Sequence, residues 1–211
     1  MGQSSPSDGS GPAVDPRELA TAVDRFAAAG TLLDRPSLAR VYVFVCYYGP
    51  VDRPRIRAAL DLPKTTAYQY VDELVELGLV EVDGDRPAAI SADPVQFRED
   101  GAVVTPTTLH AVSRQAIDDD VRAFTDRHGV GTLVAAVRQA GLYYAGQITR
   151  RMAADPLGVH SGEAMVIVDA LRPVVAAGRE YDPAFDVLFP DVADEIEFET
   201  DIDLSRPTTE S

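Results

Sequence analysis

Four basic side chains lie close together in a chain that is otherwise strongly acidic. They are Arg53, Arg55, Arg57 and Lys64, and Lys64 is the only lysine among 211 residues. The window 53–70 carries a net charge of +3, whereas the whole chain carries −15. Guanidinium and ammonium groups bind phosphate oxygens by charge-assisted hydrogen bonds, and such contacts position a protein on nucleic acid. The charge reversal therefore predicts a surface that binds phosphates.

The polar side chains after Lys64 are of types that read base edges. One apolar stripe indicates a helix over 64–77, formed by Ala67, Tyr70, Val71, Leu74 and Leu77. The opposite face is polar and is formed by Thr65, Thr66, Tyr68, Gln69 and Asp72. Glutamine can pair with adenine, threonine can contact the thymine methyl or a phosphate, and tyrosine can donate to a phosphate. We therefore predict a recognition helix here.

A further basic candidate follows this helix. The segment LVEVDGDRPAAISA contains the turn signal Asp83-Gly84 and predicts a two-stranded hairpin, with Arg86 just after the turn. An arginine on such a wing can enter a minor groove. Asp83 and Asp85 oppose phosphate, however, so a solvated hairpin arginine is an equally good interpretation.

The elements before the recognition helix give it a recognisable context. The run VYVFVCYY fits a strand by its alternation, but a helix is favoured because Ser37 can cap it and Gly49-Pro50 can end it. Asp52 can cap a short second helix, and Pro63 restricts the corner that precedes Lys64. Helix, helix, corner, helix and hairpin is the order of a winged helix-turn-helix.

The run TTAYQYVDELVELGLVEV resembles the signature of winged-helix transcription regulators of the broad ArsR, MarR and TrmB-like kind. In those regulators a recognition helix runs into a Leu-x-x-x-Gly-Leu-Val turn and then into the wing. The stretch from about 35 to 178 also resembles winged-helix regulators of halophilic archaea. The resemblance implies DNA binding through the helix at 64–77.

The remaining segments predict a mainly α fold with a small β component, in which a winged helix-turn-helix domain precedes a C-terminal helical domain. In the C-terminal half we expect helices over 106–129, 132–153 and 161–178, the last capped by Ser161 and kinked at Pro173. The expected divisions are a disordered arm at 1–14, a dimerisation helix at 15–33 that stops at Gly30, the winged domain at 34–92, a hairpin connector at 93–105, the helical domain at 106–190, and an acidic disordered tail at 191–211.

Composition sets further bounds. Of 19 basic residues 18 are arginine, and abundant acid with almost no lysine resembles the bias of salt-accumulating halophilic archaea, although an ordinary acidic protein is the alternative. In molar salt the Debye length is about 3 Å, so the charges of a surface with a net charge of −15 no longer repel one another strongly.

The lone Cys46 lies in an apolar run, which predicts a buried structural thiol. No apolar run approaches the roughly 20 residues of a membrane helix, so we expect a cytoplasmic protein without a membrane partner.

Signatures of enzymes are missing from the sequence. It has no Gly-x-Gly-x-x-Gly, P-loop, Gly-x-Ser-x-Gly or His-Glu-x-x-His motif. His110, His128 and His160 are far apart in sequence, and the run 118–120 reads as a solvated acidic surface. We therefore expect no catalytic residues, no cofactor and no metal site.

Tyr143 and Tyr144 raise the question of an effector pocket. They are flanked by Ala140, Gly141, Ala145 and Gly146, and small residues favour close helix packing, which fits a two-fold dimer axis better than a cavity. The sequence as a whole predicts a homodimeric regulator that binds specific sites on double-stranded DNA. The alternatives are a winged-helix protein-interaction adaptor and a regulator that senses a small molecule in its helical half.

Overall fold

The computed structural model describes residues 16–84, 88–99, 102–196 and 198. The chain order of its elements is α1 (Pro16–Asp34), α2 (Pro36–Tyr48), α3 (Arg53–Ala59), α4 (Lys64–Glu76), β1 (Val80–Asp83), β2 (Ala89–Ala92), β3 (Phe97–Glu99), β4 (Ala102–Val104), α5 (Pro106–Arg114), α6 (Asp119–Tyr144), α7 (Ala154–Leu157), α8 (Ser161–Ala170), α9 (Arg172–Tyr181), α10 (Phe185–Leu188) and the short helix η1 (Ala193–Glu195). This mainly helical fold with small antiparallel sheets confirms the predicted class.

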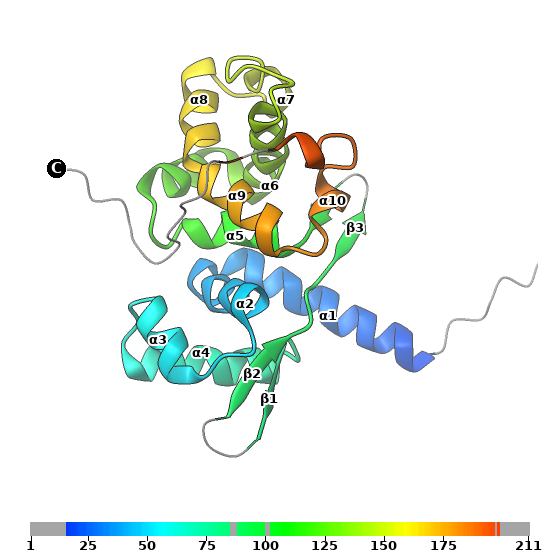
Figure 1. Ribbon diagram of the computed structural model, residues 1–211, viewed down its shortest axis with the longest axis vertical. Coiled ribbons are helices and arrows are strands. Elements are labelled where there is room, and N and C mark those ends of the chain that lie inside the picture. Colours follow the sequence, from blue (N-terminus) through cyan, green and yellow to red (C-terminus); the bar gives the residue numbers. More distant parts are fainter. Residues whose placement is uncertain (1–15, 85–87, 100–101, 197, 199–211) are drawn as a thin grey trace, which may run out of the picture.

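The elements form two stacked halves (Figure 1). Helices α2, α3 and α4 and the β1–β2 hairpin lie in the lower half of that view, and α5 to α10 lie above them. In β1–β2 the register pairs Val80 with Ala92 and Asp83 with Ala89. The second hairpin pairs β3 with β4, as expected for the connector. No helix within the described part of the chain is long and apolar enough to span a membrane.

The segment VYVFVCYY, which by its sequence fits either a strand or a helix, is part of helix α2. It is apolar on most of its surface, so most of its residues are buried, and it packs against α5 of the upper half. The expected cap at Ser37 is wrong, because Arg35 is the N-cap residue and Pro36 occupies the first turn. Cys46 on this helix is half-buried, and burial raises the pKa of its thiol to about 12. A protonated thiol is a poor nucleophile, which agrees with a structural role.

Helix α1 continues past its expected stop. Gly30 is an ordinary helical residue, and the helix ends at Asp34 because Pro36 disfavours the helical conformation at the residue before it. Two large apolar side chains of α1 point outward: Val23 and Phe26 are each more than half exposed. The buried side of α1 is formed by Ala28, Ala29 and Leu32.

The C-terminal half breaks into more helices than the sequence predicts. The expected helix 106–129 is interrupted because Asp118 caps a new helix: its carboxylate accepts hydrogen bonds from the backbone N–H groups of Asp120 and Val121 at 3.1 Å. The interpretation of Asp118 as a merely solvated acid is therefore wrong. Helix α6 then bends at Gly129, whose φ is 82°.

Two further helix boundaries differ from the predictions. The expected helix 132–153 ends at Tyr144, just before Gly146 with a φ of 73°, and Met152 is exposed. The expected helix 161–178 is two helices, because Pro173 lies in the first turn of α9 and cannot extend α8. The cap of α8 is His160 and not Ser161, since His160 Nδ1 accepts from the N–H of Gly162 at 3.2 Å.

The first part of the expected acidic tail packs against the helical half. Val192, Ala193 and Ile196 are buried in the core of the helical half, so the prediction of disorder is wrong for 191–196. Burial of these apolar side chains outweighs the repulsion expected from their acidic neighbours. The rest of the tail from 199 onward and the arm at 1–14 lie outside the described residues.

Helix α5 is the element that joins the two halves. Every residue from Pro106 to Ser113 is buried, including the polar side chains of Thr107 and His110. At its start the Asp182 carboxylate accepts hydrogen bonds from the Thr107 N–H at 2.9 Å and from the Thr107 hydroxyl at 2.6 Å. Gly178 of α9 allows this approach, because a Cβ there would lie 2.3 Å from the Thr107 hydroxyl oxygen.

Replacing Gly178 by alanine is expected to lower the free energy of unfolding by about 1–3 kcal/mol, because the added methyl group overpacks this contact. Chemical denaturation followed by circular dichroism measures the change. Gly30→Ala is the matched control: that glycine is helical, exposed and free of neighbours, so alanine there should stabilise by about 0.5–1 kcal/mol. Equal midpoints for the two variants would contradict the tight α5–α9 contact.

Candidate nucleic-acid interface

The basic helix α3 begins at a well-formed cap. The carboxylate of Asp52 accepts a hydrogen bond from the Arg55 backbone N–H at 2.8 Å, and Pro54 fits the first turn. Ile56 is the one fully buried side chain of this helix, whereas Arg55 and Arg57 are exposed. The cap and the single apolar anchor therefore present the arginines to solvent.

The corner between α3 and α4 is held by backbone geometry. Asp61 has a φ of 48°, a left-handed conformation that non-glycine residues rarely adopt. The Leu62 N–H donates to the Arg57 carbonyl at 3.1 Å, and the Arg40 guanidinium of α2 donates to the Leu60 carbonyl at 3.0 Å. The corner is therefore held by a hydrogen bond to α3 itself and by one contact from α2.

The recognition helix predicted at 64–77 corresponds to α4, with its apolar stripe facing inward. Ala67, Val71 and Leu74 are fully buried, while Thr65 and Gln69 on the opposite side are exposed. Thr66 and Tyr68 are partly exposed. The helix ends where Gly78 adopts a φ of 66°, which leads the chain into β1. The structure therefore places the predicted reading residues together on one outward face.

One basic residue of α3, Arg53, and one of α4, Lys64, lie beside the same aromatic ring. The guanidinium of Arg53 lies 5.1 Å from the centroid of the Tyr68 ring, and Lys64 Nζ lies 5.6 Å from the same centroid. Arg53 also forms an ion pair with Asp72, with Arg53 Nη2 and Asp72 Oδ1 2.5 Å apart. This ion pair could not be predicted from the sequence, because Arg53 and Asp72 are 19 positions apart and no local spacing connects them.

The basic residues of α3 and α4 differ in whether an acidic side chain compensates their charge. Asp72 compensates the charge of Arg53, so Arg53 is better placed to fix α3 against α4 than to bind phosphate. Among the ion pairs of the described residues none involves Arg55, Arg57 or Lys64. These three keep their full charge for an external anion.

The wing is present, but its arginine is not described. Strands β1 and β2 pair along their whole length, and Val51 forms a bridge with Ile90 that joins the hairpin to the loop before α3. Gly84 has a φ of 80°, in agreement with a turn at that position. Arg86 lies outside the described residues, so its role in a minor groove stays a prediction.

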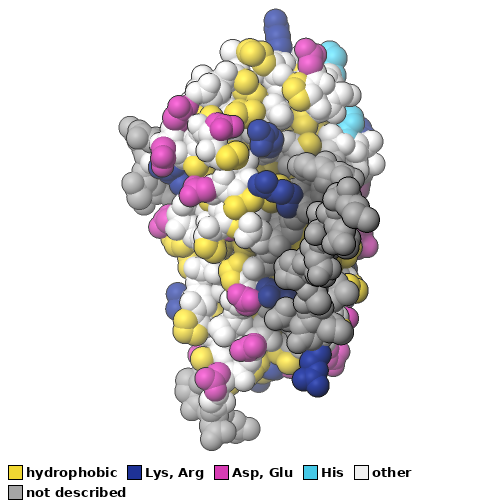
Figure 2. Space-filling model, turned by 90° about the vertical axis from the view of Figure 1, so that its right-hand side faces the viewer, with side chains coloured by type: hydrophobic (Ala, Val, Ile, Leu, Met, Phe, Trp, Pro, Cys, Tyr) yellow, Lys and Arg dark blue, Asp and Glu magenta, His cyan; other side chains and the backbone are white. Residues whose placement is uncertain are grey.

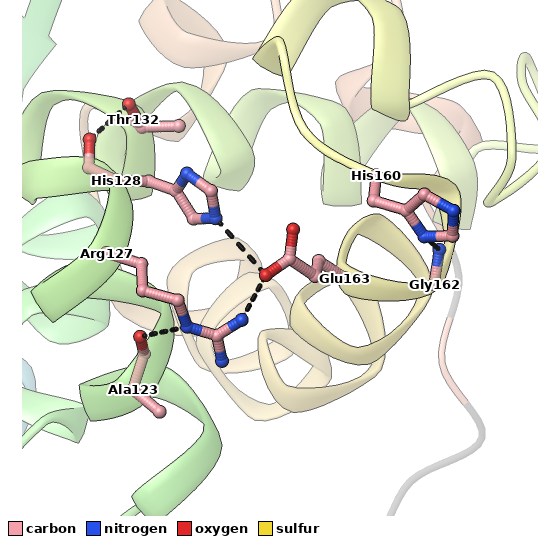
Figure 3. Close-up of polar contacts among 7 residues, drawn as sticks. All are labelled: Ala123, Arg127, His128, Thr132, His160, Gly162 and Glu163. Carbon is pink, nitrogen blue, oxygen red and sulfur yellow. Dashed lines mark hydrogen bonds and ion pairs between the residues drawn. The ribbon is translucent and has the colours of Figure 1, made fainter.

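One histidine of the helical half, His128, contacts the carboxylate of Glu163, whereas the imidazole of His160 accepts a hydrogen bond from the Gly162 N–H and points away from it (Figure 3). His128 Nε2 lies 3.4 Å from Glu163 Oε1, and the Arg127 guanidinium pairs with the same oxygen. Desolvation raises the pKa of Glu163, but hydrogen bonds from His128 and the His160 backbone and the Arg127 charge outweigh it, so the net shift is downward. No group of three or more metal-binding side chains occurs within the ranges that the structure describes. The cluster joins α6 to α8.

Residues around Tyr143 and Tyr144 pack against other parts of the same chain. A Cβ on Gly141 would lie 2.0 Å from the Phe189 ring, so this glycine packs against Phe189. Arg150 pairs with Asp169 of α8 at 2.8 Å and lies over the Tyr143 ring. The interpretation of the small residues as a dimer contact is therefore wrong for Gly141.

Two family models match parts of the chain. Residues 53–84 match the IclR helix-turn-helix domain, and residues 115–180 match a family of unknown function (DUF7437). The comparisons with curated proteins and with solved structures found no match. The first match covers α3, the corner, α4 and β1, and it supports a helix-turn-helix regulator that binds DNA. The narrower resemblance to ArsR, MarR and TrmB-like regulators, and to those of halophilic archaea, stays a prediction.

Proposed function

We propose that the protein is a sequence-specific transcriptional regulator that binds double-stranded DNA as a homodimer and places α4 in the major groove. The observation that carries the proposal is the outward face of α4, where Thr65, Thr66 and Gln69 stand beside uncompensated basic residues. Its segment matches a helix-turn-helix domain, whose second helix enters the major groove in DNA-binding members of the class. No catalytic step is part of this function.

The charges around α4 suggest how the helix would dock. Arg55, Arg57 and Lys64 would bind phosphates and set the orientation of the domain, because phosphate contacts position while base contacts specify. Gln69 and the two threonines would then face base edges. Arg53 would hold α3 and α4 in a fixed relation through Asp72. Recognition of the DNA sequence would then depend mainly on neutral hydrogen-bonding side chains.

A neutral reading face also suits the acidic and arginine-rich composition of the chain. In molar potassium salt, which we propose as the working environment, release of counterions contributes little to affinity. Hydrogen bonds and shape would then have to supply the specificity. A cytoplasmic location follows from this proposal, since its target is cellular DNA.

Helix α1 supports the homodimer. Its N-terminal part extends away from the rest of the fold (Figure 1), and Val23 and Phe26 on it are 57% and 56% exposed. On the molecular side toward which α1 extends, acidic, basic and hydrophobic side chains are interspersed (Figure 2). Helix α8 offers a second apolar area at Met165 and Val166. Pairing of α1, with a contribution from the C-terminal helices, would place two copies of α4 in successive major grooves of a pseudo-palindromic site.

Replacing Thr66 and Gln69 together by alanine is expected to abolish a discrete footprint on genomic DNA while leaving the melting temperature within a few degrees of the parent. The reason is that both side chains contact base edges and neither supports the core. Gln139→Ala on α6 is the control and should keep the footprint. The absence of any footprint for the parent protein would contradict the proposal and favour a protein-interaction role.

The salt dependence of DNA affinity tests the availability of the charges. Arg57→Ala should reduce the slope of log K against log salt by about 0.9 for each phosphate contact that is lost. Asp72→Asn should steepen the slope, because it releases the charge of Arg53. Titration of fluorescent DNA from low to molar potassium chloride measures both. Identical slopes for the two variants would contradict this assignment of charges. A steep loss of the parent protein's DNA affinity between low and molar potassium chloride would contradict recognition mainly by neutral groups.

Val23→Glu is expected to dissociate the dimer in sedimentation velocity experiments, because it places a charge in the apolar α1 contact. Met165→Glu tests α8 in the same way, and Thr149→Glu, at an exposed site outside both helices, is the control. If Val23→Glu and Met165→Glu sediment like the parent dimer, neither helix forms the interface.

A further inference from the structure

A small cavity lies where the helix-turn-helix half meets the helical half. Its volume is about 50 Å³. Side chains of α2 and α5 form most of its wall, and the α3 end and the segment after α5 complete it. The lining residues are Arg40, Val43, Phe44, Tyr47, Tyr48, Leu60, His110, Ser113, Arg114 and Ile117. A space of this size holds one or two water molecules or an organic group of a few heavy atoms.

His110 is the first sign that the cavity receives a polar ligand. Its side chain is 9% exposed, and its Nδ1 atom has no hydrogen-bond partner within the described structure. Burial, followed by the positive charges of Arg114 and Arg40, lowers the pKa of His110 to about 3. The imidazole is therefore neutral at physiological pH and can offer an N–H to an anion through one of its tautomers. A buried polar atom left unpaired costs free energy, so it favours a bound partner.

The two arginines give the cavity its charge preference. Burial and the charge of Arg114 lower the pKa of Arg40, while Asp61 raises it. Arg114 pairs with Asp118 through one nitrogen, with a separation of 2.6 Å, but its buried Nε atom has no partner. Two like charges that destabilise each other are stabilised by an anion placed between them. The apolar walls, Phe44 and Leu60 among them, would accept a short hydrocarbon group beside the anionic head.

We propose that this cavity binds a small monocarboxylate of two or three carbons, with its carboxylate against Arg40, Arg114 and His110 and its alkyl group against Phe44 and Leu60. Ile117, which is 39% exposed, forms part of the rim by which the ligand enters. The ligand class follows from the charges, the unpaired nitrogen and the volume of the site.

The position of Arg40 connects the cavity to the corner before α4. Its guanidinium donates to the Leu60 carbonyl at 3.0 Å, directly before Asp61 with its left-handed φ of 48°. A carboxylate in the cavity competes with that carbonyl for the guanidinium, which weakens the support of a strained corner. Ligand binding then shifts the corner away from its DNA-binding geometry. This coupling, unlike the site itself, rests on the proposed function.

Direct binding tests the site without DNA. We expect acetate to shift the NMR signals of the His110 ring and the Arg40 guanidinium saturably, with a Kd of about 0.1–10 mM, because so small a ligand makes few contacts. Acetamide, its neutral isostere, should shift them at least tenfold more weakly. Ionic strength is held constant with potassium fluoride. Equal responses to acetate and acetamide, or no saturable shift with acetate, would overturn the proposal.

Variants at the rim provide a matched comparison that does not disturb the core. Ile117→Asp should weaken acetate binding at least fivefold, since it adds a negative charge at the entrance, whereas Ile117→Asn should bind as the parent does. Arg40→Gln should lose binding, with its folded state checked by circular dichroism. Equal affinity of the Asp and Asn variants would show that the anion does not occupy this cavity.

The coupling has its own readout. Acetate should weaken DNA affinity at least threefold in the parent protein, and the Ile117→Asp variant should need a higher acetate concentration for the same effect. Acetate binding without any change in DNA affinity would leave the site standing and overturn the coupling. A parent protein that binds acetate but not DNA would overturn the proposed function and the coupling, while the NMR result still supports the site.

Discussion

The burial of α5 between α2 and α9 is the contact on which the rest of the structure depends. Asp182 fixes its first turn by accepting two hydrogen bonds from Thr107, and Gly178 lets α9 approach closely enough for this to occur. Because α2 also belongs to the helix-turn-helix half, one buried helix joins the DNA-binding elements to the helical half. The two halves therefore share apolar side chains, such as Leu109 and Ala177, across their boundary.

This shared core has a consequence for the surface. Most of α2 is buried. Helices α3 and α4 are held by only a few apolar anchors, among them Ile56 and Leu74, and their other faces stay open. Polar and basic groups can gather there without cost to packing. The Arg53–Asp72 pair connects the two helices, and the remaining basic groups keep their charge for a partner. Rigid support and an uncommitted face are the conditions that recognition of DNA requires.

The same junction explains why polar groups are buried at the cavity. His110 lies on a helix that is covered on all sides, so its imidazole is enclosed, and two arginines from different helices approach it. Most interiors avoid such an arrangement because unpaired polar atoms and like charges destabilise the fold. Arg40 connects this cavity to the corner before α4, which is why we propose that a ligand bound here affects the corner.

The sequence by itself determined α3, α4 and the polar outward face of α4, because these follow from short-range periodicity and a local cap. The apolar stripe of α4 and the cap at Asp52 are decided within a few residues, and both were predicted correctly. Tertiary structure decided the rest. The pairing of Arg53 with Asp72 and the cavity at His110 depend on residues distant in the chain. Likewise, the burial of Val192, Ala193 and Ile196 follows from a core that composition does not reveal, since long-range packing can override local polarity.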